Sequence, residues 1–206
     1  TRYRARRELR DRLPAEVLPA VKAWTARLKP SDPWHDLHQL EALYVQAGFH
    51  VLDSAQLKTV MGLPSRDARA MAVHVLGEEL AYVPDAIATL RIAVKDPDPR
   101  VRLEALRALS FIETPESVNL VLEVAAQPLD YWVDYTLQST LGALQSVWQP
   151  VLEKGQIAQA NPAGREYLDN YIKGQPSLGL VKQNLQKLIE AQDLTAEDRV
   201  RLIRSV

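Results

Sequence analysis

The sequence predicts an all-α protein in which pairs of helices stack into an α-α superhelix. Three observations lead to this fold class. Apolar residues recur at spacings of three and four, prolines follow small polar residues that can begin helices, and one helical pattern returns every 30 to 37 residues. Clean period-two alternation is nearly absent, so no strand is predicted.

The composition suits packed helices and excludes several kinds of site. Hydrophobic residues make up 47% of the 206 residues, but only two are Phe, so Leu, Val and Ala must fill most of the interior. Leu and Ala are strong helix formers. The absence of cysteine excludes disulfides, thiolate metal sites, cysteine nucleophiles and CxxCH haem attachment within these residues, and we expect no cofactor. A net charge of −1 makes nucleic acid an unlikely partner for the surface as a whole.

Four dipeptides mark helix starts, each a small polar residue followed by proline: Asp32-Pro33, Asp98-Pro99, Thr114-Pro115 and Asn161-Pro162. A side-chain oxygen at the N-cap accepts from free backbone N–H groups, and proline at the first helical position loses no hydrogen bond. Ser65 and Asp130 are further caps, and Thr195 with Asp198 resembles a capping box.

Together with the apolar spacing, these signals predict thirteen helices, at 1–12, 14–29, 33–47, 53–62, 66–80, 84–94, 99–112, 115–126, 130–147, 149–159, 162–173, 178–191 and 195–205.

One helical pattern repeats along the chain. The segment 101–109 aligns with 68–76 at an offset of 33, and 38–43 shares its Leu-Glu-Ala-Leu string; 132–137 follows more loosely, and 2–9 is a frayed first copy. A small residue anchors each copy, at Ala5, Ala42, Ala72, Ala105 and Thr136, and each interval holds one further amphipathic helix. About five helical pairs are therefore expected, each burying its apolar stripe against the next.

The period fades near residue 148, where Trp148-Gln149-Pro150 is expected to break a helix. We expect a single domain over 1–206, with regular repeats in 1–147 and divergent helices in 148–206. Because the chain begins inside a helical pattern, we also expect it to be a segment of a longer protein.

The segment from Asp96 to Arg102, Asp-Pro-Asp-Pro-Arg-Val-Arg, resembles the HEAT-repeat pattern of an Asp-Pro turn followed by Val-Arg and an Ala and Leu stripe. The resemblance implies a HEAT-like solenoid with a ladder of Asp and Arg side chains along its inner side. It makes Arg69 and Arg102, which occupy equivalent positions, possible partner-binding residues.

Residues 1–145 also resemble a narrower group of proteins than HEAT repeats in general. The strings at 3–9, 38–43, 99–111 and 130–137 resemble the helical segment of large bacterial proteins described as PVC-type haem-binding or membrane-bound dehydrogenase-like. In those proteins a dehydrogenase-like propeller precedes the helical repeats and a c-type cytochrome domain follows them. The resemblance implies a periplasmic or otherwise exported protein and carries over no catalytic residue. The sequence shows no signal peptide and no apolar run of about 18 residues, and it leaves a cytoplasmic location open.

Two clusters are candidate sites. His35 and His38 lie three apart on one helix and could share a metal with Asp36 or His50, although two histidines alone are weak evidence. The alternative is that His35 faces water and His38 faces the neighbouring helix. The second cluster, at the start of one helix, suits a partner-binding hot spot because Trp and Tyr bury large areas; it comprises Tyr131, Trp132, Asp134 and Tyr135. Its alternative is a set of aromatic core positions.

The first twelve residues hold six arginines against Glu8 and Asp11. This helix is either a patch for phosphate or an acidic partner, or a solvated face held by pairs such as Glu8–Arg12 and Arg7–Asp11.

Three functions follow from these patterns. The first is a non-catalytic scaffold or docking module for proteins or neighbouring domains, which a concave solenoid suits. The alternative is a nucleic-acid-binding repeat protein that uses the arginine-rich first helix. The third, an enzyme or metal protein, depends on His35 and His38. We expect the scaffold, and not an enzyme.

Overall fold

The computed structural model describes residues 2–158, 161–174 and 195–203. Every α-helix and short 3-10 helix (η) within these ranges is one of the following: α1 (Arg2–Arg10), α2 (Pro14–Thr25), α3 (His35–Ala47), α4 (Ser54–Met61), α5 (Arg66–Glu78), η1 (Leu80–Tyr82), α6 (Ala86–Ala93), α7 (Pro99–Leu109), α8 (Pro115–Glu123), η2 (Val124–Ala126), α9 (Tyr131–Ala143), α10 (Gln145–Glu153), α11 (Pro162–Gly174) and α13 (Ala196–Ile203).

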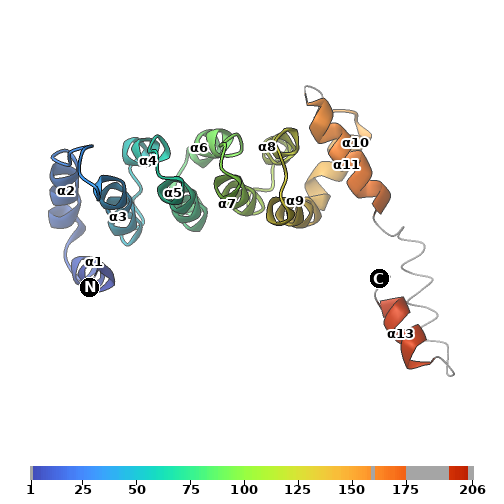
Figure 1. The fold of residues 1–206 in the computed structure, drawn as a ribbon, viewed down its shortest axis with the longest axis horizontal. Coiled ribbons are helices and arrows are strands. Elements are labelled where there is room, and N and C mark those ends of the chain that lie inside the picture. The colour runs from blue at the N-terminus through green and yellow to red at the C-terminus, as the bar shows by residue number, and fades with distance from the viewer. Residues whose placement is uncertain (1, 159–160, 175–194, 204–206) are drawn as a thin grey trace. The chain divides into compact units, whose positions relative to one another are not determined.

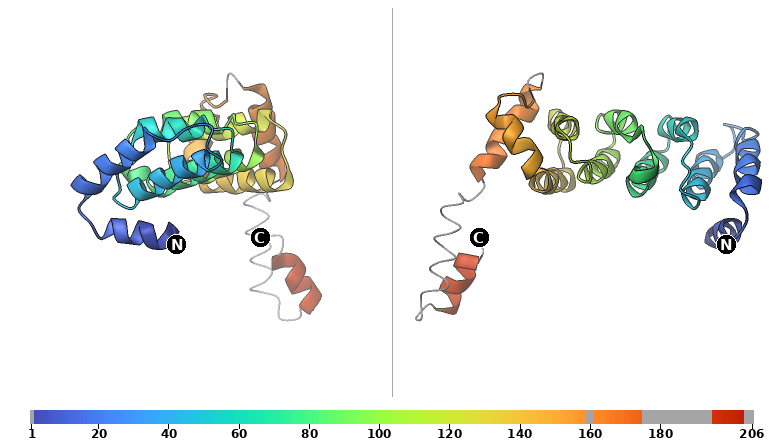
Figure 2. Two further views of the ribbon diagram at one scale, coloured as in Figure 1. Left: turned by 60° about the vertical axis from the view of Figure 1, so that its left-hand side comes forward. Right: turned by 180° about the vertical axis from the view of Figure 1, so that it is seen from behind.

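The chain divides into two compact units, residues 1–165 and 166–206, and each is described by itself. In the first unit α3, α5, α7 and α9 lie side by side in one row, and α2, α4, α6 and α8 form a second row against them (Figure 1; Figure 2). This arrangement confirms the predicted all-α solenoid of paired helices. The prediction of one domain over the whole chain stays a prediction.

The capping residues begin helices as their side chains predict. Ser65 accepts a hydrogen bond from the Ala68 N–H at 3.2 Å, and Asp130 accepts from the Val133 N–H at 2.8 Å. Asp32 differs, because it caps the turn before α3: its carboxylate accepts from the Trp34 N–H at 2.8 Å. The helix predicted to begin at residue 33 therefore begins at 35.

Small side chains lie where the row of helices crosses most closely. Ala42, Ala72 and Ala105 are fully buried, as the repeat predicted. Ala5 and Thr136 do not occupy the buried anchor position that the repeat predicted for them. Ala5 is exposed, like most of α1, which has no buried residue, and Thr136 is partly exposed. Counted from the capping aspartates, α9 places Leu137 where α7 places Ala105, and Leu137 is fully buried.

The predicted helix 130–147 is two helices, and its break lies at Leu144, before the Trp-Gln-Pro string. The indole N–H of Trp148 donates to the carbonyl of Leu141 at 2.8 Å, and the ring is buried. This contact turns α10 back onto the end of α9, whereas Pro150 lies inside α10. The predicted helix 178–191 lies outside the described residues.

Gly164 allows the start of α11 to lie against α8. A Cβ at this position would meet the Leu122 carbonyl oxygen at 2.6 Å and the Asn161 side-chain nitrogen at 2.5 Å. Neither can move freely, because the Asn161 amide donates to that same carbonyl at 2.9 Å.

We expect Gly164→Ala to lower the free energy of unfolding by about 1–3 kcal/mol, as overpacking does. Chemical denaturation of the variant measures the loss. Gly174→Ala is the control, because its Cβ would meet nothing within 4 Å. Equal stability of the two variants would contradict the close approach.

Candidate functional site

Three aromatic side chains project from the first turns of α9, and together we call them the α9 aromatic surface. Tyr131, Trp132 and Tyr135 are 70%, 65% and 60% exposed. The rings of Tyr131 and Trp132 meet edge to face with centroids 5.0 Å apart, and those of Tyr131 and Tyr135 lie within 20° of parallel at 6.4 Å. The rings contact one another and leave their outer faces to solvent. They are therefore not core positions, which removes the alternative interpretation of this cluster.

The position of α9 in its row explains this exposure. Counted from their capping aspartates, Arg102 and Leu106 of α7 correspond to Asp134 and Gln138 of α9. The α7 residues are buried, whereas Asp134 is partly exposed and Gln138 is exposed. Within residues 2–158 the row ends at α9 (Figure 1), so α9 keeps open a face that α7 buries.

The two predicted partner-binding arginines instead join consecutive repeats. Arg69 donates to both carboxylate oxygens of Asp96 at 2.8 and 3.0 Å, and to the carbonyls of Leu63 and Pro64 at 2.9 and 3.0 Å. These hydrogen bonds to Asp96 raise the pKa of the Arg69 guanidinium, although desolvation opposes the rise.

Arg102 repeats this arrangement one unit later and is only 2% exposed. Its guanidinium donates to the carbonyls of Asp96, Pro97 and Pro128 at 2.8, 3.0 and 2.7 Å. The expectation that Arg102 contacts a partner is therefore wrong, since the side chain is buried and its two terminal nitrogens donate to three loop carbonyls inside the chain. Arg69, with its side chain largely covered, serves the same internal purpose.

One comparison with known proteins found a match within the repeat region. Residues 55–142, from α4 to α9, match the model of the family described as HEAT repeats. The match supports a HEAT-repeat helical family for this segment. No curated protein and no solved structure matches the chain. The narrower similarity to dehydrogenase-like proteins therefore stays a prediction.

His35 and His38 precede the HEAT segment and are the candidate metal ligands. Within the described ranges no group of three or more His, Cys, Asp or Glu side chains is placed to hold an ion. His35 bonds Asp36 at 3.0 Å and Gln39 at 3.3 Å through its two ring nitrogens. His38 lies against the Trp24 ring of α2, with ring centroids 5.6 Å apart, so it faces the neighbouring helix as the alternative interpretation predicted. The same interpretation placed His35 in water, but the His35 side chain is mostly covered.

The arginine-rich helix α1 is partly neutralised by its own chain. Arg2 and Arg6 both approach Glu41 of α3, at 3.4 and 3.7 Å, and Arg12 pairs with Glu8 at 3.3 Å as predicted. Arg6 also lies over the Tyr44 ring, 4.4 Å from its centroid. Burial raises the pKa of the Tyr44 phenol, and the charge of Arg6 partly offsets the rise.

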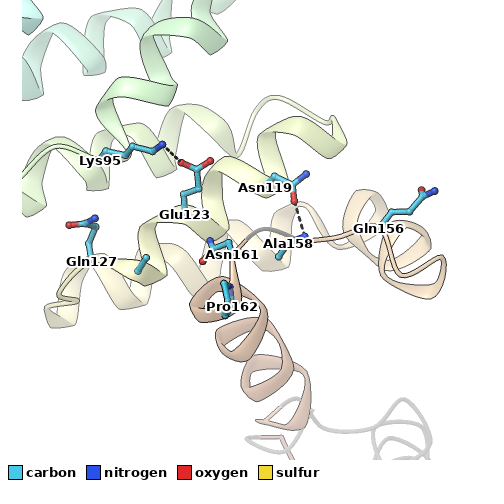
Figure 3. Close-up of a pocket in the computed structure, with 9 residues that line it drawn as sticks. Lys95, Asn119, Glu123, Gln127, Gln156, Ala158, Asn161 and Pro162 are labelled. Atoms are coloured by element: carbon cyan, nitrogen blue, oxygen red, sulfur yellow. Dashed lines mark hydrogen bonds and ion pairs between the residues drawn. The ribbon is translucent and has the colours of Figure 1, made fainter.

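The structure also shows a cleft of about 590 Å³ that the sequence did not indicate, between α8 and the start of α11 (Figure 3). Its charges are already paired, because Lys95 and Glu123 lie 2.9 Å apart. Asn119 accepts from the Ala158 N–H at 3.0 Å, so this side chain holds the connection between α10 and α11. Lys95, Glu123 and Asn119 are thus engaged in contacts within the fold.

The Arg69–Asp96 pair gives a test of the HEAT ladder. We expect Asp96→Asn to lower the free energy of unfolding by about 2–3 kcal/mol, because it leaves a largely covered guanidinium without its countercharge. Denaturant unfolding measures the loss.

The control is Asp67→Asn, which removes a carboxylate from the exposed Arg100–Asp67 pair at 3.0 Å. It should cost less than about 1 kcal/mol. A loss as large as that of Asp96→Asn would show that burial of the ladder does not matter.

Proposed function

We propose that the chain is a non-catalytic docking module that holds a protein partner through the α9 aromatic surface. HEAT repeats commonly serve as scaffolds for protein interactions. The observation that carries the proposal is the cluster of three contiguous, exposed aromatic rings on one rigid helix of the repeat segment.

The three rings favour binding for two reasons: they offer a large contact area, and the helix holds them in place before a partner arrives. Each of these rings can bury roughly 150–250 Å² against a partner, and Trp and Tyr dominate the few residues that carry binding energy in interfaces. An α-helix fixes their backbone before binding, and two χ angles per side chain leave little entropy to lose. Other exposed aromatics are dispersed; Tyr82, for example, is stacked on His50 with centroids 4.5 Å apart.

The aspartates of the repeats stabilise the fold, which agrees with a non-catalytic role for the module. Aspartates cap helices, as Asp53 and Asp98 do, or pair with arginines across consecutive repeats. Within the described residues no helix is long and apolar enough to cross a membrane.

We expect the triple variant Tyr131→Ala, Trp132→Ala, Tyr135→Ala to bind its partner at least roughly 30-fold more weakly, the equivalent of about 2 kcal/mol. Capture of proteins from the source extract, followed by affinity measurement for each captured protein, provides the readout. The matched control is Trp34→Ala, Ile92→Ala, Phe111→Ala, which removes three exposed apolar side chains elsewhere. Circular dichroism verifies that both variants fold. If both retain the same proteins equally, the α9 aromatic surface is not the docking site.

The wider context is a proposal of its own, and it rests on sequence similarity alone. We propose that the module lies within a larger exported redox protein, between dehydrogenase-like and c-type cytochrome domains. The intact mass of the native polypeptide, with peptide mapping on both sides of residues 1–206, tests this. A much longer chain carrying a CxxCH domain supports it, and a free chain of about 23.1 kDa overturns it.

A further inference from the structure

A smaller cleft, of about 330 Å³, lies between α1 and α3, at the opposite end of the solenoid from the α9 aromatic surface. We call it the α1–α3 cleft, and its lining includes Tyr3, Arg6, Arg7, Arg10, Tyr44 and Val45. The four α1 residues among these stand at positions 3, 6, 7 and 10, a spacing that places them on one face of a helix. Three guanidinium groups and two phenol rings therefore line a single hollow.

The three arginines of the cleft differ in what they already contact. Arg6 is engaged, because it lies 3.7 Å from the Glu41 carboxylate. Arg7 and Arg10 are exposed, and within the described residues their side chains form no ion pair and no hydrogen bond. The Arg7–Asp11 pair that the sequence suggested is therefore not formed there. Two positive charges of the cleft thus have no countercharge within the described part of the chain.

The two phenol rings suit the cleft to a carboxylate. The Arg7 guanidinium lies 6.0 Å from the Tyr3 ring centroid, a contact that orients the planar group and leaves its N–H donors open. The Tyr44 hydroxyl forms no hydrogen bond within the described ranges. Burial raises the pKa of this phenol, so the group stays protonated and can donate. The cleft thus offers a carboxylate guanidinium donors from α1 and a phenol donor from α3.

We propose that the α1–α3 cleft binds an acidic segment of a partner protein, whose Glu or Asp side chains pair with Arg7 and Arg10. Charge complementarity is the reason, because residues 2–12 hold six arginines against two carboxylates, Glu8 and Asp11. Ion pairs in a partly covered cleft are screened less than pairs on an open face, and the planar fork of Arg matches a carboxylate. This site is separate from the α9 aromatic surface and does not rest on the proposed function.

A nucleic acid fits this end of the chain less well. Helix α1 has nine residues, and at 1.5 Å per residue it is about 13 Å long. Of the arginines outside the cleft, Arg2 pairs with Glu41 at 3.4 Å and Arg12 pairs with Glu8 at 3.3 Å. Nucleic-acid sites spread positive charge along several phosphates, and a net charge of −1 gives the whole chain no such excess. A short acidic peptide matches the two charges that the cleft leaves open.

The acidic side chains of a second copy also fit less well than those of a separate protein. Glu116 of α8 pairs with Arg91 of α6. Glu123, also of α8, pairs with Lys95 at 2.9 Å. A second copy would have to break these pairs before α8 could present its carboxylates to the cleft, whereas a separate acidic segment has no such pairs to break.

Binding of synthetic peptides to the full chain tests the proposal. The probe is a fluorescently labelled twelve-residue peptide of alternating glutamate and serine, and its neutral counterpart has glutamine in place of glutamate. Anisotropy titrations give both dissociation constants. We expect roughly tenfold tighter binding of the glutamate peptide, with the difference reduced at high salt. Equal binding of the two peptides overturns the proposal.

Two paired variants assign the binding to the cleft. Arg7→Gln with Arg10→Gln removes the two open charges, and we expect it to weaken the glutamate peptide about tenfold. The matched control, Arg4→Gln with Arg12→Gln, removes the same charge from the same segment outside the cleft lining and should stay within about threefold. Circular dichroism verifies that both variants fold. An equal loss in the two variants would make the binding a diffuse charge effect and rule out the cleft.

A conservative change tests the α3 wall. Tyr44→Phe keeps the ring beneath Arg6 and removes only the hydroxyl. We expect it to weaken the glutamate peptide about fivefold, the loss of one hydrogen bond. Unchanged binding would place the peptide on the outer side of α1 and exclude the cleft.

The α9 triple variant (Tyr131→Ala, Trp132→Ala, Tyr135→Ala) separates this site from the proposed function. It should bind the glutamate peptide within about twofold of the unchanged chain, because distant sites act independently. A loss as large as that of the Arg7 and Arg10 variant would place the peptide on the α9 aromatic surface and overturn the second site. Capture of a partner by the α9 rings still stands or falls in its own experiment.

Two measurements cover the other occupants. A labelled oligothymidylate with six phosphates should bind more weakly than the glutamate peptide; tighter binding that is lost with Arg7→Gln and Arg10→Gln would make a nucleic acid the occupant. Sedimentation velocity is expected to show a monomer. Oligomers that vanish in the same variant would make a second copy the occupant and overturn a separate partner.

Discussion

The close side-by-side packing of α5, α7 and α9 is the constraint on which the rest of the structure depends. Helices can approach this closely only where side chains are small, and α5 and α7 meet at such a point: a Cβ on Gly77 would lie 3.2 Å from the Ala108 Cβ. At the helix starts, the guanidinium of Arg102 joins the loops before α7 and α9 by donating to Asp96 and Pro128 carbonyls. Packing sets the spacing of the row, and the arginines tie the turns in register.

The α9 aromatic surface lies on the last helix of the row formed by α3, α5, α7 and α9. Each inner helix buries one face against the helix before it and one against the helix after it. Within residues 2–158 nothing in the row follows α9, so side chains that would face a neighbour are free to be polar or to project aromatic rings. The same geometry explains why α1, at the opposite end, has no buried residue.

The sequence predicted the helix starts well because capping is local. Ser65, Asp98 and Asp130 each accept from an N–H two or three residues ahead, and such bonds need no distant partner. The break at Leu144 was missed because it depends on the Trp148 indole reaching back seven residues to the Leu141 carbonyl, a contact that no short-range pattern encodes. The cleft beside Lys95 was missed for the same reason, since its walls come from α8 and the connection to α11.

The sequence by itself determined that this protein is a stack of helical pairs, because apolar spacing, caps and repeat period are properties of neighbouring residues. It also marked the aromatic cluster of α9 as a candidate site. Only the tertiary structure decided which candidates face solvent. Arg102 and Trp132 are equally plausible contacts in sequence, yet one is 2% and the other 65% exposed. The reason is physical: exposure depends on whether another helix or loop covers a side chain, and that depends on its place in the row.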